Sequence, residues 1–167
     1  MRKMTEENLK AAFAGESQAH VKYAAFADRA EREGLTNVAR LFRAASFAEQ
    51  VHATKHLMAL QGIGGTADNL AAAIAGETFE VEEMYPAYNA VAELQGEPAA
   101  LKSMQRALEA EKIHAALYAK AREAAAAGRD AEIGTVVVCQ ACGYTAEGEP
   151  PDRCPLCGAP RERFSKF

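Results

Sequence analysis

Two short motifs pair a glutamate with a histidine three residues later, and two others pair cysteines at the same spacing. The first kind is Glu49/His52 and Glu111/His114, and the second is Cys139/Cys142 and Cys154/Cys157. On an α-helix, residues i and i+3 lie on one face, so such a glutamate and histidine can reach the same metal ion. Two C-x-x-C pairs can close a tetrahedral four-thiolate site. The sequence therefore predicts two chemically different metal sites.

Each glutamate–histidine motif belongs to one copy of an internal repeat. The segment Ala-Gly-Glu-Ser at residues 14–17 returns as Ala-Gly-Glu-Thr at residues 75–78. Both copies continue with a tyrosine, a glycine and the motif, namely Tyr23, Gly34 and Glu49/His52 in the first and Tyr85, Gly96 and Glu111/His114 in the second. A helical hairpin that occurs twice is typical of a pseudo-symmetric four-helix bundle.

The elements that must position these residues are four helices and one short strand. We expect helices from a Thr5 cap to Gly34, from Asn37 to before Gly62, from a Thr66 cap to Gly96, and from Pro98 to Gly128, then a strand at 136–138. Caps, a first-turn proline and terminal glycines give these limits. The prediction is a mainly α fold with a small cysteine-rich domain after it.

Four glutamates, one on each expected helix, lie on the apolar faces of those helices. They are Glu16, Glu49, Glu77 and Glu111. A lone glutamate in an alanine-rich helix is usually solvated. Four inward carboxylates would be costly to bury and would repel one another, and cations in the core remove both objections.

Carboxylates with a few imidazoles suit iron or manganese. An even division over two repeats indicates two ions bridged by Glu49 and Glu111. Glu16 and Glu77 would then be terminal ligands, with His52 and His114 near one ion each. His20 and His56, one turn further along, are expected to be exposed or to support the ligands.

The second copy of the repeat contains one residue more than the first. Glu16 and Tyr23 are seven steps apart, whereas Glu77 and Tyr85 are eight. A helix usually absorbs one extra residue as a π-bulge, and such bulges favour functional sites. We expect a bulge between Glu77 and Pro86, near Glu80.

The whole chain resembles rubrerythrin, in which a ferritin-like di-iron bundle precedes a rubredoxin domain. The resemblance rests on Gly15-Glu16-Ser17-Gln18-Ala19, the two E-x-x-H motifs, Gly76-Glu77-x-x-Glu80 and Met84-Tyr85-Pro86. It implies a bundle over 1–131 and a rubredoxin-like domain over 135–167. It also implies that Glu80 is a further ligand, and that one iron moves between His52 and Glu80 as its redox state changes. Tyr23 and Tyr85 would be hydrogen-bond partners of ligand carboxylates.

The details Cys-Gly-Tyr and Cys-Pro-x-Cys-Gly around Cys139, Cys142, Cys154 and Cys157 resemble rubredoxin. They favour one iron here, whose role would be one-electron transfer. Zinc is the structural alternative, because zinc ribbons share this spacing.

The activity implied by the resemblance is reduction of hydrogen peroxide to water at the di-iron centre, a defence against oxidative stress. The rubredoxin-type iron would relay electrons from an external donor such as a reductase or a rubredoxin. A ferroxidase or iron-handling protein would use the same bundle. A non-enzymatic metal-binding module with zinc in the four-cysteine site is the alternative of another class.

The connection between the second and third helices is short. The resemblance implies that these helices run parallel, so the link must cover about 33 Å of helix. The six steps from Leu60 to Thr66 reach about 21 Å at most. We expect a homodimer that exchanges helical hairpins, so that Glu16, Glu49 and His52 of one chain meet the other ligands of its partner. Fraying near residues 62–65 is the alternative.

Composition and charge narrow the classes of partner and the location that we expect for this protein. The 167 residues carry a formal net charge of -4, which argues against nucleic acid as a partner. No apolar run is long enough to span a bilayer and no export signal is visible, so we expect no membrane partner and a cytoplasmic location. In that reducing environment paired C-x-x-C motifs hold metal more often than they form disulfides.

Overall fold

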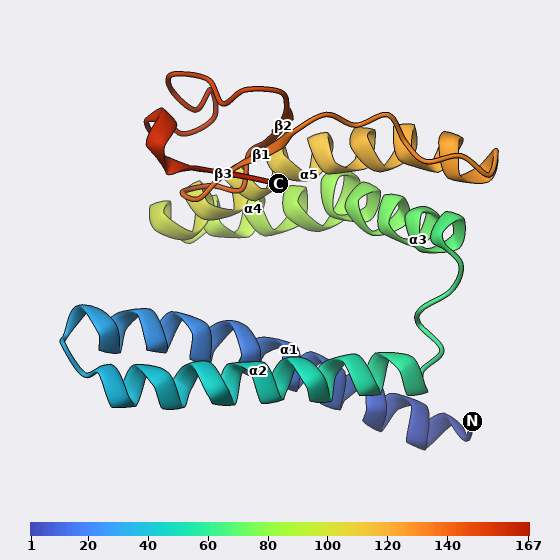
Figure 1. Cartoon of the computed structure of the whole chain (residues 1–167), viewed down its shortest axis with the longest axis horizontal. Coiled ribbons are helices and arrows are strands. Elements are labelled where there is room, and N and C mark those ends of the chain that lie inside the picture. Colours follow the sequence, from blue (N-terminus) through green and yellow to red (C-terminus); the bar gives the residue numbers. More distant parts are fainter. The chain divides into compact units, whose positions relative to one another are not determined.

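The computed structural model describes residues 1–167, which divide into two compact units, 1–64 and 65–167. The first unit is a hairpin of α1 (Lys3–Arg32) and α2 (Thr36–Ala59). The second contains α3 (Thr66–Phe79), a π-helical segment (Glu80–Met84), α4 (Tyr85–Leu94) and α5 (Pro98–Ala126), followed by the cysteine-rich domain (Figure 1). No helix combines the length and apolar content needed to cross a membrane.

In both helical hairpins, the helix before the turn ends with the same hydrogen-bond pattern. The backbone N–H of Leu35 donates to Ala30 O at 2.9 Å, and that of Glu97 donates to Ala92 O at 2.9 Å. Each bond reaches back five residues past the terminal glycine and satisfies a carbonyl that the helix leaves free. The internal repeat seen in the sequence is therefore a structural repeat as well.

Both predicted N-terminal caps were wrong. α1 begins at Lys3, because the N–H of Glu6 already donates to Arg2 O at 3.0 Å, and Thr5 lies inside the helix. Thr66 is the first residue of α3, and Gly65 occupies the cap position without a side-chain bond. The cap position lies three residues before Thr5 in α1 and one residue before Thr66 in α3, because helix limits depend on small energy differences.

The predicted π-bulge is confirmed. α3, Glu80–Met84 and α4 form one continuous helical stretch with π geometry at its centre. Pro86 follows this segment, and its missing N–H suits a place where the i to i−4 pattern is already broken. The extra residue of the second repeat is thus absorbed next to Glu80.

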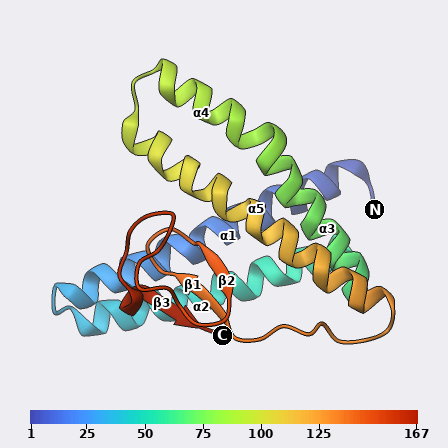
Figure 2. The same ribbon diagram turned by 90° about the horizontal axis from the view of Figure 1, so that it is seen from above.

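The cysteine-rich domain contains a three-stranded antiparallel sheet with the order β2-β1-β3. Its strands are β1 (Val136–Cys139), β2 (Thr145–Glu147) and β3 (Phe164–Lys166), with a 3₁₀ turn at Arg161–Arg163. Val137, Cys139, Cys154 and Phe164 form its buried core. Figure 2 shows the sheet beside α5, where Lys120 and Glu147 form an ion pair at 2.7 Å.

The α1–α2 hairpin buries mostly small residues. Ala27, Ala30, Ala39, Ser46 and Ala53 are buried where the two helices meet. Large apolar side chains stay open, among them Leu41 and Phe47, which are 69% and 66% exposed. A two-helix hairpin has no third layer to cover such side chains.

Candidate metal centres

One cluster of ligand-type side chains forms inside the α1–α2 hairpin. Glu16, Glu49 and His52 each offer a ligand atom, and these atoms lie within 4.8 Å of one another. His52 Nδ1 lies 2.9 Å from Glu49 Oε2. The bond to His52 is the main cause that lowers the pKa of Glu49. The i, i+3 spacing of the motif thus brings Glu49 and His52 together on one face of α2, as the sequence predicts.

A matching cluster forms inside the second unit, between α3 and α5. Glu77, Glu111 and His114 offer ligand atoms that also lie within 4.8 Å of one another. His114 Nδ1 lies 2.6 Å from Glu111 Oε2 and 4.0 Å from Glu77 Oε1. The three side chains are partly buried, with 17–26% of each exposed. Each copy of the repeat therefore presents two carboxylates and one imidazole.

Glu80 stands apart from that three-residue cluster but within its electrostatic influence. Burial raises the pKa of Glu80, and the negative charge of Glu111 adds to the effect. The pKa of Glu77 is raised by burial and then by Glu111. These carboxylates repel one another, and a cation between them would relieve the repulsion.

The predicted tyrosines lie in different surroundings. The Tyr23 ring packs against Phe26 and Phe42, with centroids 6.2 and 6.1 Å away. Burial raises the pKa of Tyr85, and the charges of Glu80 and Glu111 raise it further. The carboxylates of the second unit therefore act electrostatically on Tyr85. The hydrogen-bonding role of both tyrosines stays a prediction.

His20 links α1 to α2 through hydrogen bonds and lies outside both clusters. Its Nδ1 donates to Ser46 O at 2.9 Å, and the buried Ser46 hydroxyl donates back to His20 O at 2.8 Å. This pair of bonds fixes the register of the two helices that carry Glu16 and Glu49.

The four cysteines converge in the second unit. Cys139 Sγ lies 3.7 Å from Cys157 Sγ, and Cys142 Sγ lies 3.6 Å from Cys154 Sγ. All four sulfurs lie within 4.8 Å of one another, which is the grouping that a tetrahedral thiolate site requires.

The two cysteine loops have the same backbone geometry. A glycine with positive φ follows the second cysteine of each pair, Gly143 at 80° and Gly158 at 76°. This left-handed conformation suits glycine and turns the next N–H toward sulfur. Burial raises the pKa of Cys142 to about 12 despite the N–H of Tyr144. For Cys157, burial is outweighed by the N–H of Ala159 and neighbouring thiols, and the pKa falls to about 7.

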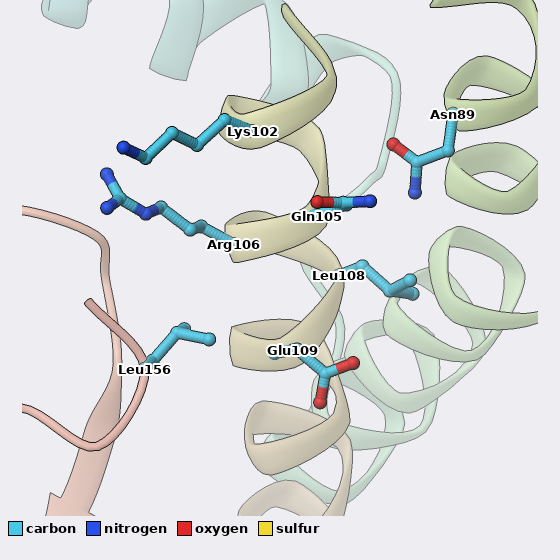
Figure 3. A pocket seen from close by; sticks show the side chains of 7 residues that line it. All are labelled: Asn89, Lys102, Gln105, Arg106, Leu108, Glu109 and Leu156. Atoms are coloured by element: carbon cyan, nitrogen blue, oxygen red, sulfur yellow. The ribbon is translucent and has the colours of Figure 1, made fainter. Parts of the chain in front are cut away.

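A cavity of about 550 Å³ lies between α4, α5 and the second cysteine loop. In Figure 3, Lys102 and Arg106 extend from α5 on the side of Leu156, whereas Gln105 extends toward Asn89 of α4. Lys102 and Arg106 also line a neighbouring cavity of about 490 Å³ together with Cys142. Neither cation forms an ion pair, and sequence reasoning gave no sign that they flank both cysteine loops.

Two helical hairpins that each carry one carboxylate–histidine cluster, with a small sheet and four converging cysteines after the second, define a non-haem metalloprotein with two kinds of site. The family model for rubrerythrin matches residues 7–122, and that for the rubrerythrin rubredoxin-like domain matches residues 138–165. The chain therefore belongs to the rubrerythrin family, and its fold class is the predicted one. Membership and both donor sets support iron binding.

Individual relatives cover nearly the whole chain. It is 37% identical to rubrerythrin-2 of Clostridium acetobutylicum, over 98% of this chain and 97% of that protein. It is 35% identical to nigerythrin of Nitratidesulfovibrio vulgaris, over 98% and 86%. A solved structure of nigerythrin in its fully reduced, all-ferrous state superimposes with a TM-score of 0.58, at 33% identity over 98% of this chain and 86% of that one.

Proposed function

We propose that this protein is a di-iron peroxidase in which the two carboxylate–histidine clusters combine into one active site. The observation that carries the proposal is the matched donor set of the two clusters. Each has two carboxylates and one imidazole, and either alone is half of a site for two bridged ions. Bound iron would supply the two electrons that convert one hydrogen peroxide and two protons into two water molecules.

The ligands of the first half are Glu16, Glu49 and His52. Those of the second half are Glu77, Glu111 and His114, with Glu80 as a further carboxylate that replaces His52 in one redox state. The π segment supports this last assignment, because it gives Glu80 a position that a regular helix would not. When Glu80 is not a ligand, its carboxyl group would be placed to hold a proton near the site.

Proton delivery falls to Tyr85 and Glu80. The hydroxyl of Tyr85 would donate a hydrogen bond to a reacting oxygen atom. Tyr23 would have the same role in the other half of the site, from its aromatic cluster with Phe26 and Phe42.

The four cysteines would hold one iron of the rubredoxin type beside α5, where an external donor can reduce it. Lys102 and Arg106 flank both cysteine loops and have no carboxylate partner. An acidic donor such as a rubredoxin or a reductase would find complementary charge there. A reducing compartment such as the cytoplasm would keep the cysteines available as ligands.

The two halves would come from different chains. Only residues 60–65 join α2 to α3, and large apolar side chains such as Leu41 and Phe47 stay open on the α1–α2 hairpin. A partner hairpin would cover those side chains and complete the ligand set. We therefore propose a homodimer with exchanged hairpins.

The activity is tested by reducing the iron-loaded protein without oxygen, adding stoichiometric hydrogen peroxide and following the visible spectrum. Rapid oxidation of both centres, with peroxide consumed over repeated cycles of reduction, supports the proposal. A di-iron centre that reacts with oxygen and ignores peroxide would contradict it and indicate iron handling instead.

A further inference from the structure

His114 connects two parts of the second unit through its two ring nitrogens. Nδ1 faces the carboxylates, 2.6 Å from Glu111 Oε2. Nε2 faces away from them and lies 2.8 Å from Thr145 Oγ1, on the strand that follows the first cysteine loop. One side chain of the candidate di-iron site thus contacts the four-cysteine domain directly.

The direction of these bonds follows from counting protons. A threonine hydroxyl has one hydrogen, and Thr145 donates it to Gly143 O at 2.9 Å. Thr145 Oγ1 can therefore only accept in its contact with His114, so Nε2 carries the hydrogen. A neutral ring with its hydrogen on Nε2 carries a lone pair on Nδ1, the nitrogen on the carboxylate side, and a lone pair is what a metal ligand offers.

The contact is built into the way the cysteine domain packs on α5. Thr145 is buried, with 7% of its surface exposed. A Cβ added at Gly143 would meet the methyl group of Ala110 at 4.0 Å, so the loop already approaches the helix one turn before His114. Further along α5 and β2, the ion pair of Lys120 with Glu147 contributes to the same interface.

His52 has no such support in its own unit. Its Nδ1 contacts Glu49, its side chain is 57% exposed, and Nε2 has no hydrogen-bond partner. The two histidines come from equivalent positions of the repeat, yet only one is held at both nitrogens.

We propose that Thr145 is a positioning residue for the di-iron site, which fixes the orientation and tautomer of His114 and ties that ligand to the first cysteine loop. The inference takes from the proposed function only that His114 is a metal ligand.

The test compares Thr145→Val, which keeps the shape and removes the hydroxyl, with Thr145→Ser, which keeps the hydroxyl. Thr135→Val, at an exposed threonine of the same domain, is the matched control. In the zinc-loaded full chain, nitrogen-15 NMR reports the exchange of the His114 Nε2 hydrogen with water. Anaerobic titration of ferrous iron reports the affinity of the carboxylate site.

We expect Thr145→Val to speed exchange of that hydrogen and to weaken iron binding by about tenfold or more, as loss of a ligand's supporting hydrogen bond usually does. Thr145→Ser and Thr135→Val should behave like the wild type. Wild-type exchange and affinity in Thr145→Val would overturn the inference. So would equal weakening of the four-cysteine site, which would indicate a general loss of structure. Neither readout uses peroxide, so an inactive wild type would refute the proposed function without touching this result.

Discussion

Glu111 is the residue on which the electrostatics of the second cluster depend. Its carboxylate contacts His114, and its charge raises the pKa values of Glu77, Glu80 and Tyr85, each after the effect of burial. A side chain that perturbs three titratable neighbours in one partly buried cluster is typical of a functional site. A bound cation would reverse this effect, because it favours the ionised form of every carboxylate around it.

The pH dependence of stability follows from these shifts. Glu77 and Glu80 have raised pKa values in the folded chain, so their contribution to stability is complete below the ordinary value of 4.5 and is lost as the pH rises through the raised values. With zinc kept only in the cysteine site, urea unfolding should show a larger loss of stability between pH 4 and about pH 7 in the wild type than in Glu77→Gln. Equal losses would contradict the predicted shift.

The role of Glu80 can be tested by comparison with Glu82, an exposed glutamate of the same segment. Glu80→Gln removes a proposed ligand and proton donor, so we expect peroxide turnover to fall by at least about tenfold. Glu82→Gln changes an exposed glutamate of the same π segment and should leave turnover unchanged. The measurement is steady-state peroxide consumption at saturating reductant. Parallel loss in both variants would show that the segment, and not Glu80, is responsible.

At the scale of the elements, local sequence patterns predicted much of the helical structure. The internal repeat predicted two similar hairpins, and one surplus residue between Glu77 and Tyr85 predicted the π segment. Spacing alone places Glu49 with His52, and Glu111 with His114, because one turn of helix determines both pairs. The Thr5 cap was wrong because helix limits depend on small energy differences. The Thr145–His114 bond joins residues 31 apart through packing of a strand on a helix, which no local pattern encodes.

The π segment can be removed without adding foreign residues. Deleting Val81 restores seven steps between Glu77 and the following tyrosine, as in the first repeat. We expect unchanged helical circular dichroism and no loss of stability in the metal-free chain, because a regular helix replaces a strained one. Peroxide turnover should fall by about tenfold or more as Glu80 loses its position. Full turnover would mean that the π geometry has no part in the site.

At the scale of the whole molecule, the proposed exchange of hairpins rests on the short link between α2 and α3. Each compact unit contains one copy of the repeat and one cluster of two carboxylates and one imidazole. The sequence predicted both facts through the repeat. From the short reach of the link it also predicted that the two halves come from different chains, and that arrangement stays a prediction.

Lengthening the link tests this dependence. Inserting about fifteen glycine and serine residues after Gly64 would allow one chain to close on itself. We expect the elongated variant to shift from dimer toward active monomer in analytical ultracentrifugation. An insertion of the same composition after Arg129, outside the link, should leave the dimer intact. A wild type that is already an active monomer would contradict exchange.

The most direct measurement mixes two inactive chains. Glu49→Gln damages the first half of the site and Glu111→Gln damages the second. The two variants are unfolded together, refolded, loaded with iron and assayed for peroxide consumption. With exchanged hairpins, half of the dimers contain one intact site, so activity should return to about a quarter of the wild-type value. If each site came from a single chain, every site would be damaged and the mixture would stay inactive, which would contradict an active site assembled from two chains.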